Sequence, residues 1–307
     1  MADFNPNATA APNNNIWALP FSVEDAALII IPRPIDITAS FRDGACNGPA
    51  AILAASPQID LYDEDYPDEW KKGIAMAAID RTDPIDSVNR YARMRVESII
   101  RHLESGGDMA DVCSDIEWVN GVMKGLTSDL EIQSLKYLDK SKLVAVLGGD
   151  HSTPLGLMQA LASRHDQFGV LHIDAHLDLR ESYQGFTQSH ASIMWNASKI
   201  PQISRFVHVG IRDYCEEESI FVTINDDHHE MLSDRDIAWY RWQGKMEECV
   251  RHTVQDLPKN VYVSFDIDGL DPSLCPNTGT PVPGGLQYEE ALSIVNEIIE
   301  SERRIIG

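Results

Sequence analysis

The chain has 307 residues, 43% of them hydrophobic, which is enough apolar material to bury the core of one large α/β domain. Its 25 Lys and Arg residues against 48 Asp and Glu residues give a formal net charge of -23, which disfavours nucleic acid and anionic membrane surfaces as partners. Five scattered cysteines without CxxC spacing indicate neither a disulfide framework nor a zinc knuckle, so a cytoplasmic protein is predicted.

The N-terminal residues 1–25 are rich in Asn, Ala and Pro and are predicted to form an extension in front of a single domain over residues 26–307. They lack the basic and apolar segments of a secretion signal, and no apolar run approaches the roughly 20 residues of a membrane span. A buried strand is then expected at 27–32, a helix at 48–55 and a short strand at 73–79.

Two segments with apolar residues at helical spacing follow, at 85–103 and about 109–138. An all-apolar strand at 142–147 then runs into a Gly-Gly-Asp-His turn ending at His151, and a helix is expected from 154 to 164. A strand, a glycine turn and a helix together present a side chain at the carboxyl end of a parallel sheet.

The segment Phe168–Asp178, FGVLHIDAHLD, begins as a buried strand and ends in Asp174, His176 and Asp178 at alternate positions. Side chains two residues apart in extended backbone point the same way, so these three are predicted to converge. Carboxylates held beside an imidazole need compensating positive charge, which a divalent cation supplies. The alternative for this triplet is a solvated loop after a buried strand.

The rest of the chain continues the alternation of strands and helices, and it predicts a three-layer α/β/α domain with a mainly parallel sheet. Asp266 and Asp268 close its last long strand. The predicted elements are strands at 206–210 and 220–224, a helix at 242–254, a strand at 261–268, a helix at 286–300 and the opening of a strand at 304–307.

Three strand ends therefore carry side chains of metal-ligand type, namely His151, Asp174, His176, Asp178, Asp266 and Asp268. Parallel sheets gather ligands at the carboxyl ends of their strands, so the six are predicted to converge. Two His with several carboxylates suit Mn²⁺ and can also hold Ni²⁺, Co²⁺ or Fe²⁺. Six mostly negative ligands exceed the need of one ion, which predicts two metals with shared carboxylates and a bridging water. The alternative is a helix N-terminal His and solvated acids.

Three segments resemble the signature motifs of the ureohydrolases, the arginase and agmatinase family: GGDHS at 148–152, DAHLD at 174–178, and SFDID at 264–268 followed by Asp271-Pro272. The similarity runs from about residue 27 to the end of the chain. It implies an arginase-like fold, a two-metal centre held by the same six residues, and hydrolysis of a guanidino group to urea and an amine or ammonia. It also implies a homotrimer or homohexamer.

The resemblance places a proton shuttle at His190, in the Ser-His pair after the DAHLD motif. An imidazole titrates near the working pH and can protonate the leaving nitrogen of a guanidino substrate, so His190 is predicted to be catalytic and to contact the substrate. The alternative is an exposed loop histidine. Asp178 is also predicted to be catalytic, because its carboxylate can orient the attacking hydroxide by accepting a hydrogen bond.

The substrate is predicted to be a small guanidino compound. After His190 the chain reads ASIMW, and bulky Met194 and Trp195 can shorten the pocket, so Trp195 is predicted to contact substrate. This loop, the N-terminal extension and the acidic region around 107–120 resemble the guanidine hydrolase branch, so free guanidine is the first choice, with Ni²⁺ or Mn²⁺. Agmatine or guanidinobutyrate with Mn²⁺ is the alternative, and a non-catalytic metal-binding subunit is a third hypothesis.

Members of this family carry a Glu that contacts the substrate guanidinium on the strand after the helix predicted at 286–300. The chain stops at Gly307 as that strand begins, so the domain is expected to be incomplete at its C-terminus. The guanidinium-contacting Glu is accordingly expected beyond residue 307, or a neighbouring subunit supplies the carboxylate. The isolated 307-residue chain is expected to be poorly soluble or inactive.

Overall fold

The computed structural model describes residues 4–9, 13–78 and 84–307. Its strands are β1 (Leu28–Arg33), β2 (Ile74–Met76), β3 (Leu143–Gly148), β4 (Phe168–Ile173), β5 (Ile203–Ile211), β6 (His229–Ser233), β7 (Asn260–Phe265) and β8 (Arg304–Ile305). Its α-helices are α1 (Gly48–Ala55), α2 (Pro84–Glu104), α3 (Cys113–Leu138), α4 (Leu155–Ala162), α5 (Ile193–Ala197), α6 (Glu216–Ile224), α7 (Asp234–Trp242), α8 (Met246–Gln255) and α9 (Tyr288–Glu300).

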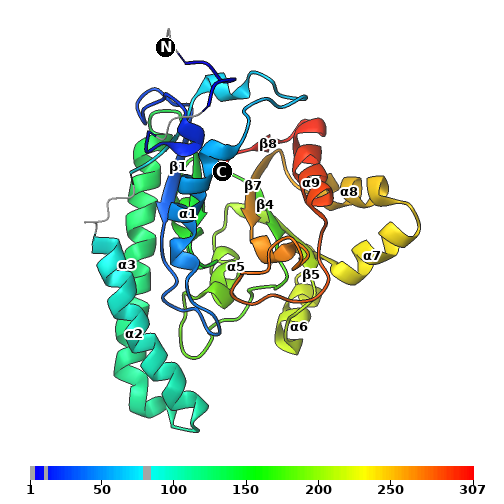
Figure 1. The fold of residues 1–307 in the computed structure, drawn as a ribbon. Coiled ribbons are helices and arrows are strands. Elements are labelled where there is room, and N and C mark those ends of the chain that lie inside the picture. Colours follow the sequence, from blue (N-terminus) through cyan, green and yellow to red (C-terminus); the bar gives the residue numbers. More distant parts are fainter. Residues whose placement is uncertain (1–3, 10–12, 79–83) are drawn as a thin grey trace.

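The strands form two parallel sheets, which lie at the centre of the molecule with helices on either side (Figure 1). One sheet has the order β2-β1-β3 and the other β6-β5-β4-β7-β8, and every strand pairing is parallel. Parallel strands need crossover connections, and the helices supply them. The predicted three-layer α/β/α class is therefore confirmed, although the described residues form two sheets instead of one.

Strand β4 is the centre of the larger sheet, and all six of its residues are buried. Its alternate side chains enter different hydrophobic clusters: Val170 packs in the cluster that includes α4 and α5, and Leu171 packs in the cluster that includes α8 and α9. A strand covered on both faces needs a continuous apolar run, which explains the sequence of this segment.

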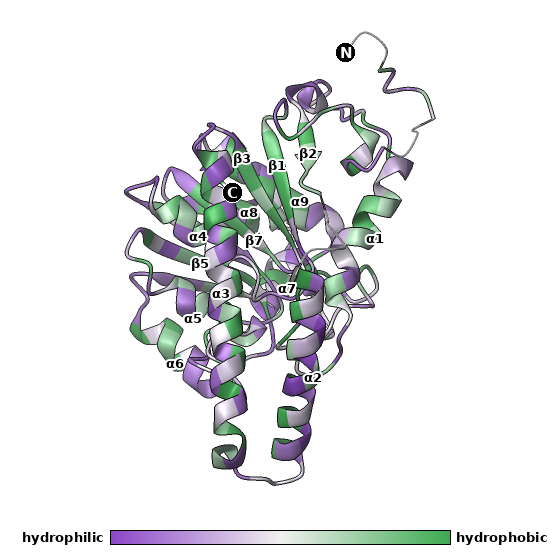
Figure 2. Ribbon diagram, turned by 90° about the vertical axis from the view of Figure 1, so that its left-hand side faces the viewer, coloured by the Kyte–Doolittle hydropathy of each residue, from purple (hydrophilic) through white to green (hydrophobic). Residues whose placement is uncertain are grey.

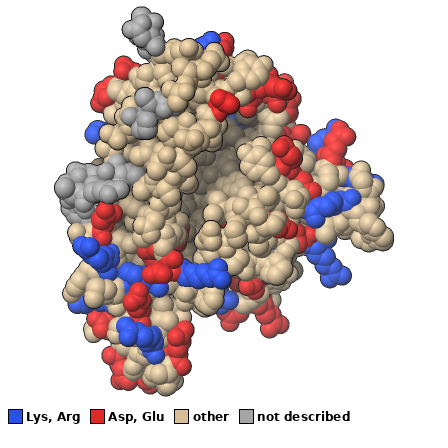
Figure 3. Space-filling model, viewed as in Figure 1, with Lys and Arg blue, Asp and Glu red and all other residues tan. Residues whose placement is uncertain are grey.

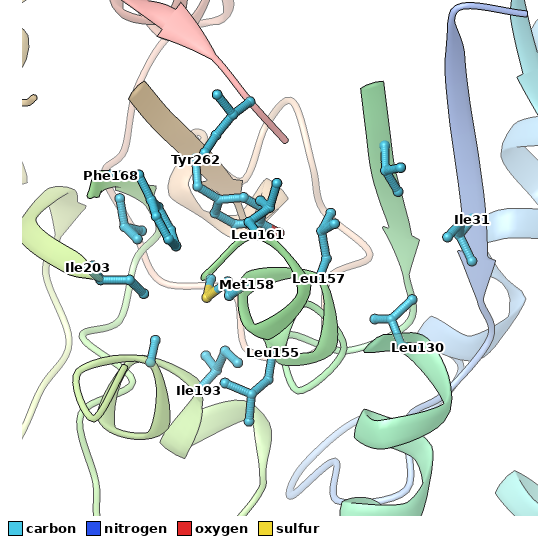
Figure 4. Packing of buried hydrophobic residues seen from close by; sticks show 14 of the residues in the cluster. Ile31, Leu130, Leu155, Leu157, Met158, Leu161, Phe168, Ile193, Ile203 and Tyr262 are labelled. Carbon is cyan, nitrogen blue, oxygen red and sulfur yellow. The ribbon is translucent and has the colours of Figure 1, made fainter. Parts of the chain in front are cut away.

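Helix α4 fills the space beside the larger sheet (Figure 4). Its side chains Leu157, Met158 and Leu161 are fully buried, in the same cluster as Phe168 of β4 and Tyr262 of β7. The green strands in Figure 2 show the same concentration of apolar residues in the interior. Helices α2 and α3 form a long pair that packs around a third apolar cluster and extends from the body.

Most predicted elements are present, but the strand predicted at 220–224 is wrong, because these residues belong to helix α6. The buried carboxylate of Glu218 accepts hydrogen bonds from the backbone N–H groups of Cys215 and Leu179, at 2.9 and 3.0 Å. This cap fixes the start of the helix and overrides the β-branched run that suggested a strand. The actual strand, β6, follows at 229–233 and was missed.

The helix predicted at 242–254 corresponds to α8, which begins only at Met246, after a turn at Gly244 with a φ of 70°; Trp242 ends α7, a helix that was not predicted. The strand predicted at 73–79 spans Ile74–Met76, and residue 79 lies outside the described residues.

In the N-terminal segment, Ile16 and Leu19 are buried in the interior. Among the described residues, no helix is long and apolar enough to cross a membrane.

Candidate metal centre

The structure brings the six predicted ligand residues together beyond the carboxyl ends of three strands. They follow β3 (His151), β4 (Asp174, His176 and Asp178) and β7 (Asp266 and Asp268). Strands β4 and β7 are hydrogen-bonded neighbours, so their ends meet at one edge of the sheet. Parallel sheets commonly bind their ligands at this edge, because the carboxyl ends of neighbouring strands lie side by side there.

The first group of donors surrounds His151. Its Nδ1 atom lies 2.7 Å from Asp174 Oδ2, 3.1 Å from Asp178 Oδ2 and 3.5 Å from Asp266 Oδ2. The ring of His151 is also held by Ser264, whose Oγ lies 2.8 Å from Nε2. His151 therefore presents Nδ1 to three carboxylates while its other nitrogen is fixed by a hydrogen bond.

The second group of donors surrounds His176. Its Nδ1 atom lies 3.3 Å from Asp174 Oδ1 and 3.3 Å from Asp268 Oδ2. Asp174 thus turns one oxygen to each histidine and belongs to both groups. A carboxylate shared between two donor sets is the arrangement that a pair of metal ions needs.

The electrostatics of the cluster favour a bound cation. Burial, followed by the charge of Asp174, raises the pKa of Asp178 to about 7. Burial, followed by the charge of Asp268, raises the pKa of Asp266 to about 7, and burial with Asp174 raises the pKa of Asp268 to about 6. Crowded, desolvated carboxylates resist ionisation unless positive charge compensates them, so this donor set fits divalent ions.

The histidines show the complementary shift. Burial lowers the pKa of His176, but hydrogen bonds to Asp174 and Asp268 outweigh it and raise the value to about 11. The pKa of His151 is likewise raised well above its usual range, because hydrogen bonds and charges of the surrounding carboxylates outweigh its burial. The imidazole protons thus take the place of the cations that the carboxylates attract.

Local backbone structure holds the ligands in place. Asp178 has a φ of 54°, in the left-handed region that non-glycine residues rarely adopt, and its carbonyl accepts hydrogen bonds from the backbone N–H groups of Met194 and Trp195. Asp268 Oδ1 accepts a hydrogen bond of 3.1 Å from the N–H of Ala175, which ties the end of β7 to the loop after β4. Strain at such a residue is maintained by its surroundings and is common at functional sites.

His190 begins a short 3-10 helix, His190–Ser192, and is half-buried instead of exposed. Its Nε2 atom lies 3.3 Å from Ser40 Oγ, and its buried Nδ1 atom has no hydrogen-bond partner among the described residues. Burial, followed by the positive charges of His176 and His151, lowers its pKa to about 4. The imidazole is therefore neutral, and its free Nδ1 atom is the feature that would let it exchange a proton with a neighbouring group.

Trp195 lies in helix α5, where its ring packs 5.2 Å from the ring of Phe221 and 4.6 Å from the amino group of Lys199. Met194, its neighbour, is fully buried in the main hydrophobic cluster. These are packing contacts, and a role for Trp195 in contacting the substrate stays a prediction.

The sequence interpretation left out one residue of this site. His172 belongs to none of the three motifs, yet its Nε2 atom lies 2.9 Å from Asp174 Oδ2. It belongs to the same cluster of potential ligand atoms as His151, Asp174 and Asp178. The available signal was its position two residues before Asp174, which in extended backbone predicts that both side chains point to the same side of the chain.

Comparison with known proteins agrees with this geometry. Residues 26–307 match the sequence profile of the Arginase family. An N(1)-aminopropylagmatine ureohydrolase of Thermus thermophilus is 29% identical, over 92% of this chain and 81% of the relative. The agmatinase of Neisseria meningitidis serogroup C is 28% identical, over 100% of this chain and 87% of the relative.

A solved structure shares the fold. The agmatine ureohydrolase of Thermoplasma volcanium superposes with a TM-score of 0.69 at 22% identity, covering 92% of this chain and 81% of that protein. The parallel sheets, the donor cluster at their carboxyl ends and the profile match over nearly the whole chain agree with one another. The chain therefore belongs to the arginase family of metal-dependent ureohydrolases.

Proposed function

We propose that this protein hydrolyses a guanidino C–N bond of agmatine or N(1)-aminopropylagmatine, releasing urea and an amine. The observation that carries the proposal is the convergence of six His and Asp side chains at the ends of β3, β4 and β7. The names of the curated relatives support the choice of substrate, because those relatives are N(1)-aminopropylagmatine ureohydrolases and agmatinases.

Free guanidine, the first choice from the sequence, has weaker support than the agmatinase alternative. The relatives cited above are named for long guanidino compounds, agmatine and N(1)-aminopropylagmatine, and none of them is named for free guanidine. Of the two bulky residues expected to shorten the pocket, Met194 and Trp195, the first is buried in the hydrophobic core. Agmatine therefore replaces guanidine as the leading substrate.

We propose that the metal centre binds two divalent ions, with Mn²⁺ as first choice and Ni²⁺ as alternative. His151, Asp178 and Asp266 would hold one ion, His176 and Asp268 the other, and Asp174 would contact both. Such a pair of ions lowers the pKa of water so that hydroxide is available near neutral pH. The carboxylate-rich donor set, without thiolates, suits these ions.

Two residues of this chain would handle protons. Asp178 can accept a hydrogen bond from the attacking water and orient it toward the guanidinium carbon. His190 can deliver a proton to the leaving nitrogen, since its Nδ1 atom is free of protein partners among the described residues. Ser40 would keep the ring of His190 in place through Nε2.

The charge of the protein supports a cationic substrate. The formal net charge is -23, and acidic side chains are spread over the surface in Figure 3, which is hollowed near its centre. An acidic protein attracts a substrate that carries a guanidinium at one end and an ammonium at the other.

The proposal also includes assembly into a homotrimer or homohexamer and a cytoplasmic location. Light scattering on the purified protein would test the assembly.

A single assay would test the function. Urea release should be measured with agmatine, N(1)-aminopropylagmatine, guanidinobutyrate, guanidine and arginine, after loading with Mn²⁺ or with Ni²⁺. We expect the highest kcat/KM with one of the two agmatine compounds. Higher kcat/KM with guanidine would restore the substrate expected from the sequence, and metal binding without urea from any substrate would indicate a non-catalytic subunit.

A further inference from the structure

Three histidines lie side by side on neighbouring strands behind the metal centre: His172 on β4, His208 on β5 and His229 on β6. His172 and His208 are partners in the parallel register, and His229 stands opposite Phe206, two residues before His208. His172 and His208 are inaccessible to solvent, and His229 is 3% exposed. Buried imidazoles need hydrogen-bond partners, and these three supply them to each other.

The imidazoles form an unbroken chain of contacts that ends on a predicted metal ligand. His172 Nε2 lies 2.9 Å from Asp174 Oδ2, and His172 Nδ1 lies 2.8 Å from His208 Nδ1. His208 Nε2 lies 3.0 Å from His229 Nδ1. Each separation is that of a good hydrogen bond.

The direction of every hydrogen bond in this chain is fixed by chemistry. A carboxylate only accepts hydrogen bonds, so His172 must donate from Nε2 to Asp174. A neutral imidazole has one N–H, so His172 Nδ1 must accept, and His208 must donate from Nδ1. By the same reasoning, His208 Nε2 accepts from Nδ1–H of His229. All three N–H groups therefore point toward Asp174.

The environment keeps the outer two imidazoles neutral. Burial lowers the pKa of His208 well below its usual range. Burial, followed by the charges of His228 and Arg205, lowers the pKa of His229 to about 4. The ring of His229 is stacked on Phe206 at 4.6 Å and meets the ring of Phe221 edge-on at 5.1 Å, so it is held firmly.

We propose that His172, His208 and His229 form a positioning relay that holds Asp174 in the orientation needed to contact both ions of the metal centre. Asp174 also accepts a hydrogen bond of 2.7 Å at Oδ1 from the backbone N–H of His176. Oδ2 is thus oriented by His172 and Oδ1 by the backbone, in addition to the contacts with His151 and His176, whose imidazole protons a cation would replace. The inference deepens the proposed function, since it rests on Asp174 being a ligand, and it is independent of the substrate.

The test compares His172→Leu with His172→Gln in the full chain. Gln can place its amide N–H where Nε2 of His172 lies, whereas Leu removes the donor. Mn²⁺ affinity should be measured by calorimetry after chelator treatment, and the absorption spectrum should be recorded with Co²⁺. We expect the Leu variant to bind Mn²⁺ about 10 to 100 times more weakly, which is the usual cost of losing such a partner, and Gln to restore most of the affinity.

A control variant separates positioning from loss of stability. Val207→Ala removes a buried side chain from β5 that packs in the cluster on the other face of the sheet, away from the imidazoles. It should lower Tm while leaving Mn²⁺ affinity and the Co²⁺ spectrum unchanged. Equal loss of affinity in Val207→Ala, or equal affinity in His172→Leu and wild type, would overturn the relay.

A second measurement covers the case in which His172→Leu does not fold. His208→Asn can keep a donor toward His172 Nδ1 and His208→Leu cannot, so only the Leu variant should lose Mn²⁺ affinity. Imidazole ¹⁵N spectra of the wild type with Zn²⁺ should show the proton on Nε2 of His172 and on Nδ1 of His208 and His229. The opposite tautomer at His172 or His208 would overturn the proposal.

The outcomes distinguish the relay from the proposed function. Wild-type protein that binds Mn²⁺ but releases no urea would refute the function and leave the relay intact. An active wild type whose His172 and His208 variants all bind Mn²⁺ equally well would refute the relay alone. A wild type that binds no divalent ion would refute both.

Discussion

Gly149 lies so close to Ile35 that a Cβ atom added to the glycine would be 2.0 Å from the carbonyl oxygen of Ile35. The same atom would lie 2.8 Å from the carbonyl oxygen of Arg33 at the end of β1. The turn that carries His151 is therefore pressed against the backbone after a neighbouring strand. Only glycine permits this approach, and it sets the position of His151 relative to the carboxylates of β4.

Gly149→Ala should lower the stability of the protein by at least about 1–3 kcal/mol, the usual cost of overpacking a dense site. It should also weaken metal binding, because the turn must move away from β1 and carry His151 with it. Urea denaturation and calorimetry with Mn²⁺ would measure the two effects. Gly125→Ala in α3, where an added Cβ meets nothing within 4 Å, is the matched control and should not destabilise. Unchanged Mn²⁺ affinity in Gly149→Ala would contradict this account.

Replacing Asp174 or Asp266 by Ala should remove at least one metal ion per chain and nearly all urea-forming activity. Asp174 faces both histidines of the cluster, so its loss should affect both ions, whereas the loss of Asp266 should affect the ion beside His151. Elemental analysis of purified protein would give the metal content. A fully active wild type with one ion per chain would rule out the two-metal proposal.

His190→Asn should leave the metal content intact and lower kcat by roughly 10² to 10⁴, the usual scale for losing a positioned acid or base. The reason is that His190 is the half-buried imidazole beside the cluster with a free nitrogen. Steady-state kinetics with agmatine and elemental analysis would check both parts. Ser40→Ala should have a smaller effect, because it only removes the contact that holds the ring. Undiminished kcat in His190→Asn would show that solvent supplies the proton.

Trp195→Ala should shift preference toward longer guanidino substrates if the ring forms part of the pocket wall, as the sequence predicts. A pocket discriminates by size only as far as its walls are filled. The ratio of kcat/KM for agmatine to that for guanidine would measure the shift. The ring also packs on Phe221, so a lower Tm is expected in either case. An unchanged substrate ranking together with a lower Tm would mean that Trp195 serves packing alone.

Folding stability should fall as the pH is lowered from about 6.5 to about 4, partly because of His229. The unfolded histidine has a pKa near 6.5, whereas burial holds the folded pKa at about 4. The unfolded state therefore binds the extra proton in this range, which favours unfolding as the pH falls. Each pKa unit corresponds to about 1.4 kcal/mol, so this one residue accounts for up to about 3 kcal/mol.

His229→Phe should flatten that pH dependence, measured by urea denaturation in the presence of a chelator so that metal loss does not contribute. The phenyl ring can keep the contacts with Phe206 and Phe221. His228→Gln at the exposed neighbouring position should flatten the slope less than His229→Phe does, because it removes a neighbouring charge and leaves the burial of His229 in place. Identical slopes for wild type and His229→Phe would show that His229 is not the titrating group.

Much of the fold was predictable because the relevant signals are local. The apolar runs of β1, β3, β4 and β7 and the helical spacing in α2 and α3 were each assigned to the right type of element. Segment 220–224 failed because its β-branched residues favour a strand, while the cap at Glu218 begins a helix just before it. Periodicity does not register a capping contact, and one of the two partners of Glu218, the N–H of Leu179, comes from a distant part of the chain.

The candidate site was likewise predictable in part from local signals and in part only from the folded structure. The sequence by itself determined which residues stand at the strand ends, since alternation after an apolar run places Asp174, His176 and Asp178 on one side of the chain. Their role as ligands stays a prediction from the motifs. That Asp174 and Asp178 stand within a few ångströms of His151 was decided by the tertiary structure, through the pairing of β4 with β7 and the close approach of Gly149 to the chain after β1.

Only the tertiary structure decided the role of His172. In the sequence it is one of several histidines outside the motifs, and its position two residues before Asp174 does not by itself distinguish a packing imidazole from one that orients a carboxylate. Its register against His208 on β5, and the contact of His208 with His229 on β6, bring together residues that lie up to 57 positions apart in the numbering. Register between strands is set by the burial of whole sheet faces, a property of the folded chain that no single segment encodes.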